Sequence, residues 1–261
     1  MSYSDLVYEC ADGVGLIRFN RPHVLNAMSP DMLSHLAEAL DRAALDEAVR
    51  VIVLTGEGRA FCTGADLKAS TSEGTPLDIG KLLVKYYNPV IMRIHDLEKP
   101  VICAVNGMAV GAGANLAFIC DLCIAARSAS FTQIFTQIGL IPDMGGTWSL
   151  PRLVGRQVAL GLSLLGDKIS AEEARQWGLI WQVVEDEELL ATAMALAKRL
   201  VAGPTRAYAS TKKAINASFG NSLREQLILE SELQSHCGFT EDFSEALKAF
   251  GEKRKAEFTG R

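Results

Sequence analysis

Three short runs of the chain are apolar at every position, and each is followed by a polar or glycine-containing turn. They cover residues 51–54, 101–105 and 122–126. Helical patterns separate them, over 81–95 and from about 111 to 120. Strands that are apolar on both faces and alternate with helices are typical of a mainly parallel sheet. The pattern therefore predicts an α/β fold.

The start of the chain has the pattern of a β-hairpin followed by a helix. Two runs of strand-forming residues, 6–10 and 14–19, flank Asp12-Gly13, a favoured pair for a tight turn. Ser29-Pro30 then predicts a helix start, with the serine as N-cap and the proline in the first turn. Residues 57–80 are expected to form loop and short helix.

The last part of the chain is almost entirely helical in pattern from Thr147 onward. Gly203-Pro204 and Gly220-Asn221 separate the later helices, because these residue pairs interrupt helical structure. We therefore expect an α/β core over residues 1–200 and a helical region over residues 201–261.

The composition is that of an ordinary globular protein with a modest negative charge. The 261 residues are 49% hydrophobic and 22% charged, with a formal net charge of −5. No block of lysine and arginine is present, so neither nucleic acid nor a membrane surface is an expected partner. No apolar run approaches the roughly 18 residues of a membrane span, and no secretion signal is visible. We expect a cytoplasmic protein.

The six cysteines are scattered along the chain rather than arranged as metal ligands. Cys120 and Cys123 form a Cys-x-x-Cys pair, but neither a second pair nor a thioredoxin-like context accompanies it. We expect reduced cysteines in the core, and no metal site.

Two loops of small residues follow predicted strands and are candidates for anion binding. One spans residues 59–68, and the other spans residues 106–115 and opens a helix. Small residues let a ligand approach the backbone, and the first amides of a helix lack intrahelical partners. One N–H group from each loop could hold an oxyanion. Such turns also occur where they only permit close packing, and the second loop is neither a dinucleotide fingerprint nor a Walker loop.

Asp143 lies on a third turn, beside Gly145-Gly146 and ahead of a helical run. An aspartate in this place fits the N-cap of that helix. It also fits a catalytic acid, and the residues alone leave both roles open.

Three stretches together, 61–68, 99–121 and 131–150, resemble the crotonase (enoyl-CoA hydratase/isomerase) superfamily, and the similarity continues to Phe258. The resemblance implies a spiral of ββα units with a helical C-terminal region that builds homotrimers or dimers of trimers. It implies acyl-CoA substrates and no cofactor, since the CoA belongs to the substrate. It implies an oxyanion hole made by the amides of Ala65 and Ala112. The implied pocket for substrate and CoA involves Ala27, Thr63, Asp66, Leu67, Lys68, Asn115, Phe135 and Phe258.

The chain departs from the family's hydratase pattern at two positions. Hydratases use two glutamates, where this chain has Asn115 and Phe135. Hydration needs an activated water and a protonated carbon, and that pair of acids shares the work, so hydratase activity is not expected. Asp143 takes the position at which dienoyl-CoA isomerases and aroyl-CoA dehalogenases of the family place a catalytic aspartate.

Further stretches, among them 87–89, 139–148 and 177–184, resemble the phenylacetate-degradation branch of the family. That branch converts the ring 1,2-epoxide of phenylacetyl-CoA into an oxepin-CoA and shifts double bonds in enoyl-CoA esters. We therefore predict an acyl-CoA isomerase in which Asp143 moves a proton while the oxyanion hole stabilises the enolate. Two alternatives remain, a hydrolytic dehalogenase with Asp143 as nucleophile and a non-catalytic acyl-CoA-binding scaffold.

Overall fold

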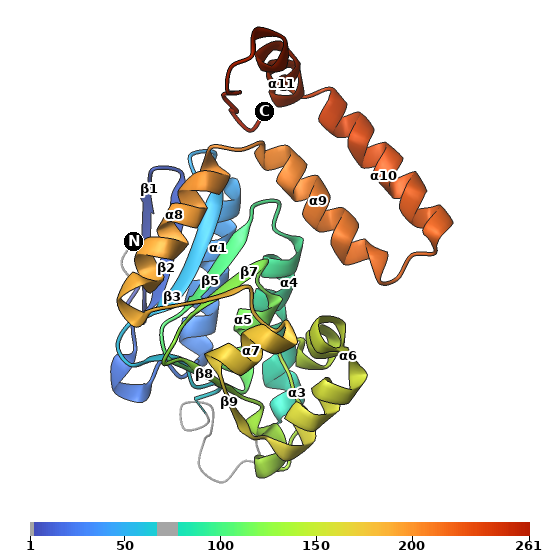
Figure 1. The fold of residues 1–261 in the computed structure, drawn as a ribbon. Coiled ribbons are helices and arrows are strands. Elements are labelled where there is room, and N and C mark those ends of the chain that lie inside the picture. Colours follow the sequence, from blue (N-terminus) through green and yellow to red (C-terminus); the bar gives the residue numbers. More distant parts are fainter. Residues whose placement is uncertain (1–2, 67–77) are drawn as a thin grey trace.

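The computed structural model describes residues 3–66 and 78–261, whose strands form two sheets (Figure 1). The first sheet has six strands in the order β1 (Leu6–Ala11), β2 (Val14–Phe19), β3 (Val51–Gly56), β5 (Val101–Val105), β7 (Leu122–Ala126) and β10 (Gln182–Val184). The second has four strands in the order β4 (Ala60–Cys62), β6 (Met108–Val110), β8 (Ser130–Thr132) and β9 (Lys168–Ser170).

The first sheet confirms the predicted hairpin and the predicted parallel pairing. β1 and β2 are antiparallel, whereas β2, β3, β5, β7 and β10 are parallel to their neighbours. Asp12 and Gly13 both have positive φ, 51° and 79°, as the expected tight turn requires. β3 and β5 are buried along nearly their whole length, which explains why they are apolar on both faces.

From β3 to β8, consecutive strands alternate between the two sheets, and each pair is followed by helical structure. The pairs β3–β4, β5–β6 and β7–β8 precede α4 (Asn88–Asp96), α5 (Ala112–Ile119) and α6 (Gly146–Leu165), respectively. Short helical turns, η2 (Leu83–Tyr87, of the π type) and η3 (Ile134–Ile138, of the 3-10 type), precede α4 and α6. The chain is therefore a series of ββα units, as the resemblance implied.

The sequence pattern missed the second sheet and the last strand of the first sheet, β10. Residues 57–80 contain β4, and the region predicted as almost entirely helical contains β9 and β10. These strands are three residues long, too short for a recognisable alternation of polar and apolar positions. Their partners are also distant in the sequence, so local pattern could not reveal the pairing.

Helices close the core around the first sheet. In α1 (Pro30–Leu45) the Ser29 hydroxyl accepts a hydrogen bond from the Met32 amide at 3.2 Å, which confirms the predicted N-cap. Within residues 3–66 and 78–201, the remaining elements of the core are η1 (Pro22–Val24), α3 (Ile79–Leu82), α7 (Ala171–Trp177), η4 (Asp186–Glu188) and α8 (Leu189–Val201).

The C-terminal region is helical, as predicted, and consists of α9 (Thr205–Ser218), α10 (Leu223–Gly238) and α11 (Glu241–Glu252). In Figure 1, α9 and α10 form a pair that projects from the core. Lys212 of α9 connects this helix pair to the core, because its ammonium group donates to the Ile94 carbonyl at 2.7 Å and to Asp121 Oδ2 at 3.0 Å. Phe239 and Phe250 are 90% and 87% exposed, an apolar surface typical of protein–protein contacts.

The C-terminal tail folds back onto the junction between the core and α9. Arg50 donates to Thr205 Oγ1 at 2.8 Å and to the Phe258 carbonyl at 3.0 Å. The buried carboxylate of Asp242 accepts hydrogen bonds from the amides of Thr259 at 2.7 Å and Gly260 at 2.9 Å. These contacts fix the backbone on both sides of Phe258.

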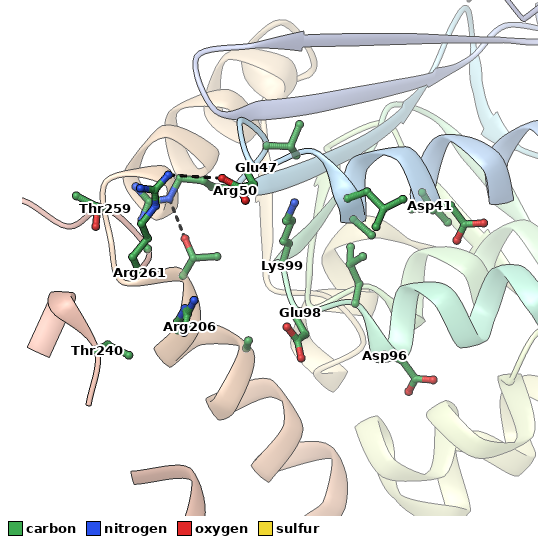
Figure 2. A pocket seen from close by; sticks show the side chains of 18 of the residues that line it. Asp41, Glu47, Arg50, Asp96, Glu98, Lys99, Arg206, Thr240, Thr259 and Arg261 are labelled. Atoms are coloured by element: carbon green, nitrogen blue, oxygen red, sulfur yellow. Dashed lines mark hydrogen bonds and ion pairs between the residues drawn. The ribbon is translucent and has the colours of Figure 1, made fainter. Parts of the chain in front are cut away.

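Figure 2 shows the groove beside this tail, with the ion pair between Arg261 and Glu47 at its edge. The groove has a volume of about 1180 Å³ and lies between α1, the end of α4 and the start of α9. Asp41 pairs with Arg93, and the Lys99 ammonium donates to the Ala43 carbonyl, so several of its charges already have partners within the protein.

Candidate active site

The two amides predicted to form an oxyanion hole belong to backbone segments that lie against each other. A Cβ placed on Gly64 would lie 3.6 Å from the amide nitrogen of Ala112 and 3.0 Å from the carbonyl oxygen of Val110. Ala112 is the first residue of α5, and Ala65 forms a parallel bridge with Met28. Within residues 3–66 and 78–261, neither the Ala65 amide nor the Ala112 amide donates a hydrogen bond. Both remain available to a ligand oxygen.

Apolar side chains cover the start of α5. A Cβ placed on Gly111 would lie 3.4 Å from Ile134 Cγ2 and 3.5 Å from Phe135 Cζ. Phe135, one of the predicted pocket residues, is buried. An oxyanion bound at the Ala112 amide would therefore lie beside a surface that excludes water, where a hydrogen bond contributes more than it does in solvent.

Asp143 lies at the turn that leads into α6. Burial raises the pKa of its carboxyl group to about 6. Its Oδ1 atom is buried and has no hydrogen-bond partner in the described part of the protein. The N-cap of α6 is Gly145, and no side chain caps this helix, so the capping role considered for Asp143 is wrong. A partly buried carboxyl with an unused oxygen and a pKa near neutrality is suited to taking and returning a proton.

Asn115 lies on α5, one turn beyond Ala112, and its side chain is completely buried. Its Nδ2 atom donates to the main-chain carbonyl of Asp143 at 2.9 Å, and its Oδ1 atom accepts from Gln133 Nε2 at 2.8 Å. Asn115 was predicted to contact substrate, but both ends of its amide bind the protein itself. Gln133, which follows β8, was not among the predicted residues.

Two of the predicted pocket residues, Ala27 and Asp66, contact Arg21, and a third, Thr63, contacts Leu25. The Arg21 guanidinium donates to the Ala27 carbonyl and pairs with the Asp66 carboxylate at 3.0 Å. The amide and the hydroxyl of Thr63 both donate to the Leu25 carbonyl, each at 3.2 Å. Arg21 was not predicted as a site residue.

Of the remaining predicted pocket residues, Phe258 is not brought to this cluster. Leu67 and Lys68 lie outside the described residues. Phe258 lies in the C-terminal tail, where Arg50 binds its carbonyl. In Figure 1 the C-terminus is close to α11, away from α6.

Tyr87 is a further residue at the site that was not among the predicted site residues. Its side chain is 3% exposed, and its hydroxyl donates to the carbonyl of Met28 at 3.3 Å. Burial raises the pKa of Tyr87, and the negative charges of Asp143 and Asp66 raise it further. Tyr87 therefore lies between the Met28–Ala65 bridge and Asp143. In the sequence, Tyr87 could have been selected because it lies in the stretch 87–89 that resembles the family.

The remaining sequence expectations concern metals, membranes and cysteines. Among the described residues, no group of three or more His, Cys, Asp or Glu side chains is placed to hold a metal ion. None of the described helices is long and apolar enough to cross a bilayer. The cysteines are free, with Cys62, Cys103, Cys120 and Cys123 buried and Cys10 exposed.

Comparison with known proteins places this fold and site in a family. Residues 9–261 match the family described as Enoyl-CoA hydratase/isomerase. The chain is 47% identical over 251 residues to 1,2-epoxyphenylacetyl-CoA isomerase of Escherichia coli strain K12, which covers 95% of this chain and 96% of that protein. It is 48% identical over 261 residues to the "Probable enoyl-CoA hydratase" of Rhodobacter capsulatus, with 100% of both chains covered.

A solved structure agrees with the sequence relatives. Enoyl-CoA hydratase from Bacillus anthracis matches with a TM-score of 0.93 and 34% identity, over 99% of this chain and 100% of that chain. Together with the succession of ββα units, these similarities show that the chain belongs to the enoyl-CoA hydratase/isomerase family and has the crotonase fold.

Proposed function

We propose that this protein is an isomerase of acyl-CoA thioesters that uses Asp143 to move a proton. The observation that carries the proposal is the Asp143 carboxyl itself, which is partly buried, has a pKa of about 6 and has a buried Oδ1 atom without a partner among the described residues. An isomerase needs one group that takes a proton and returns it elsewhere, and a single carboxylate can do both.

In this mechanism the thioester oxygen accepts hydrogen bonds from the amides of Ala65 and Ala112. Asp143 removes a proton from the carbon next to the carbonyl, and the negative charge moves onto the thioester oxygen as an enolate. Each amide donor of an oxyanion hole typically stabilises the transition state by about 2.7–4 kcal/mol. A positioned base contributes roughly 10²–10⁴-fold.

The fate of the enolate depends on the acyl group. In an unsaturated chain the proton returns two carbons away, and the double bond shifts. In a ring 1,2-epoxide of phenylacetyl-CoA, the epoxide opens, the ring expands around its oxygen, and the proton returns to a ring carbon. Both reactions leave the molecular formula unchanged, so neither needs a cofactor besides the CoA of the substrate.

The ring epoxide is the substrate that we favour. The Escherichia coli relative that is named for this reaction is 47% identical to the chain. Other relatives are named as hydratases, and the test below includes hydration for that reason. Asn115 and Phe135 replace the two acids that we expect a hydratase to need. A homotrimer or dimer of trimers and a cytoplasmic location also remain predictions.

The proposal is tested with a 3-enoyl-CoA in heavy water. Wild type is expected to exchange the proton next to the thioester for deuterium and to shift the double bond, both followed by mass spectrometry and NMR. Asp143→Asn should lose both activities by 10²-fold or more. Asp167→Asn is a matched control, since it makes the same change on an exposed aspartate just after α6. The ring epoxide would be assayed next.

Each other outcome identifies a different function. Exchange that persists in Asp143→Asn removes this residue from the mechanism. Addition of water to a 2-enoyl-CoA makes the protein a hydratase. Halide release from a haloaroyl-CoA favours the dehalogenase, and tight binding of CoA esters without any turnover favours the scaffold.

A further inference from the structure

The side chain of Asn115 joins two parts of the proposed site that are separate in the sequence. Asn115 and Ala112 lie on the first turns of α5, so the amide offered to the oxyanion and the Asn115 side chain move as one body. The Nδ2 atom of Asn115 reaches the Asp143 carbonyl at 2.9 Å. One partly buried hydrogen bond thus connects the helix that carries the oxyanion donor to the residue that carries the base.

The turn that holds Asp143 requires an external contact of this kind. Met144 and Gly145 both have left-handed backbone, with φ of 48° and 75°. This conformation is unfavourable for a residue with a side chain such as Met144. The Asp143 carbonyl accepts one hydrogen bond from within the turn, from the Gly146 amide at 2.8 Å, and its second comes from Asn115.

Packing makes the same contact tight. A Cβ on Gly146 would overlap the side-chain amide of Asn115, so the first turn of α6 lies directly on that amide. On its other side, Asn115 Oδ1 accepts from Gln133 Nε2 at 2.8 Å, and the Gln133 side chain is 3% exposed. The Asp143 carbonyl can only accept, so it fixes the Asn115 amide with the NH₂ group toward Asp143, and the Oδ1 atom of Asn115 then faces the NH₂ group of Gln133.

We propose that Asn115 and Gln133 are positioning residues that hold the Asp143 carboxyl in register with the amide of Ala112, without touching the substrate. The proposal rests on the proposed function. A carboxylate at position 115 has no hydrogen to donate to the Asp143 carbonyl. Asn115 therefore makes a hydrogen bond that an ionised acid at the same position cannot make. Misplacing a catalytic group by about 1 Å can reduce a rate by 10²-fold.

The test compares Asn115→Ala, Gln133→Leu and the double variant in the exchange assay. We expect Asn115→Ala to lower kcat by 10- to 100-fold while KM stays within about two-fold of wild type. Gln133→Leu should lower kcat by about three- to ten-fold, and the double variant should be no slower than Asn115→Ala, because both changes break one chain of contacts. Asn221→Ala is the matched control: Asn221 Nδ2 donates to Gln226 Oε1 at 3.0 Å between α9 and α10. It should leave kcat unchanged.

A second readout does not depend on turnover. The pKa of Asp143, followed by NMR of labelled aspartate in the free enzyme, should fall from about 6 in Asn115→Ala as the carboxyl gains access to water. A ten-fold rise in KM with unchanged kcat would make Asn115 a substrate contact and overturn the proposal. Unchanged kcat and an unchanged Asp143 pKa would also overturn it. If wild type shows no exchange, the proposed function fails, and the Asp143 pKa still decides the positioning role. Gln133→Leu supplies the same readouts if Asn115→Ala does not fold.

Discussion

The hydroxyl of Tyr87 donates a hydrogen bond to the main-chain carbonyl of Met28, 3.3 Å away, in the interior of the protein. The same carbonyl accepts the Asp66 amide at 2.9 Å, and the Met28 amide donates to the Gly64 carbonyl at 2.7 Å. Met28 and Ala65 are thereby held side by side. Tyr87 therefore supports the segment that presents the Ala65 amide.

We predict that Tyr87→Phe lowers kcat for proton exchange by about three- to ten-fold, because the Ala65 segment loses one of its contacts. Stability should fall by about 0.5–1.5 kcal/mol, the usual net contribution of one hydrogen bond. Tyr8→Phe is the control, since the Tyr8 hydroxyl has no partner among the described residues. Steady-state kinetics and urea unfolding measure both effects. An unchanged kcat would show that Tyr87 does not help to position the Ala65 segment.

The rate of proton abstraction should depend on pH through Asp143. Its pKa of about 6 means that the carboxyl is protonated, and inactive as a base, in half of the molecules near pH 6. We expect kcat/KM to fall about ten-fold for each pH unit below 5.5 and to level off above pH 7. A profile of deuterium exchange from pH 4.5 to 8 measures this, and a curve that stays flat to pH 4.5 contradicts the assignment.

The same carboxyl should reduce the stability of the fold at neutral pH. Its pKa in the folded protein is raised above the ordinary value, so between about pH 4 and 6 the folded state binds more protons than the unfolded state. Stability from this group is therefore present at low pH and is lost as the pH rises through 6. Asp143→Asn should be inactive yet more stable than wild type at pH 7.5, by on the order of 1–3 kcal/mol. The gain should disappear below pH 4 in urea titrations, whereas Asp167→Asn should show no such pH dependence.

The oxyanion donor at position 112 can be removed without breaking the helix. Ala112 is the first residue of α5, where proline is tolerated because its missing N–H has no partner within the helix. Ala112→Pro should therefore stay folded and lose about 10²–10³-fold in kcat. Ala112→Gly keeps the amide and should lose much less. Equal kinetics in the proline and glycine variants would argue against an oxyanion at this amide.

The attachment of α9 to the core should depend in part on Lys212. Lys212 is 11% exposed and is bound to Asp121 and to the Ile94 carbonyl. Lys212→Met leaves the Asp121 carboxylate, whose side chain is 25% exposed, without its counter-charge, which should cost about 1–2 kcal/mol in urea unfolding. Adding Asp121→Asn should recover part of that loss, because the unpaired charge is then removed. A double variant less stable than Lys212→Met would show that the charge itself is not the cause.

The sequence predicted the parts of the fold that have strong local signals. Strands over 101–105 and 122–126 were recognisable because they are buried on both faces, and Ser29-Pro30 marked the start of α1. β4 and β9 were missed because their three residues pair with segments far away in the chain. Pattern over a few residues contains no information about such pairing.

The site residues also fall into those that the local sequence predicts and those that it does not. Asp143, Ala65 and Ala112 could be named from motifs, since they lie in loops of distinctive composition. The hydrogen-bond partners of Asn115 could not be predicted from motifs. Gln133 is 18 residues away, and Asp143 accepts through its main-chain carbonyl, a group that every residue type has. The contact between Tyr87 and Met28 could not be predicted for a similar reason, since the acceptor is also a main-chain oxygen.

The proposed enolate site is built from main-chain amides, and this has an evolutionary consequence. Any substitution at positions 65 and 112 other than proline preserves the N–H group, so ordinary mutation does not erase the capacity to stabilise an enolate. The acid, by contrast, is a side chain and can be gained or lost by one substitution. A lineage with this scaffold can therefore change its reaction by relocating a carboxylate, as the Asn115, Phe135 and Asp143 positions illustrate, while its common intermediate is retained.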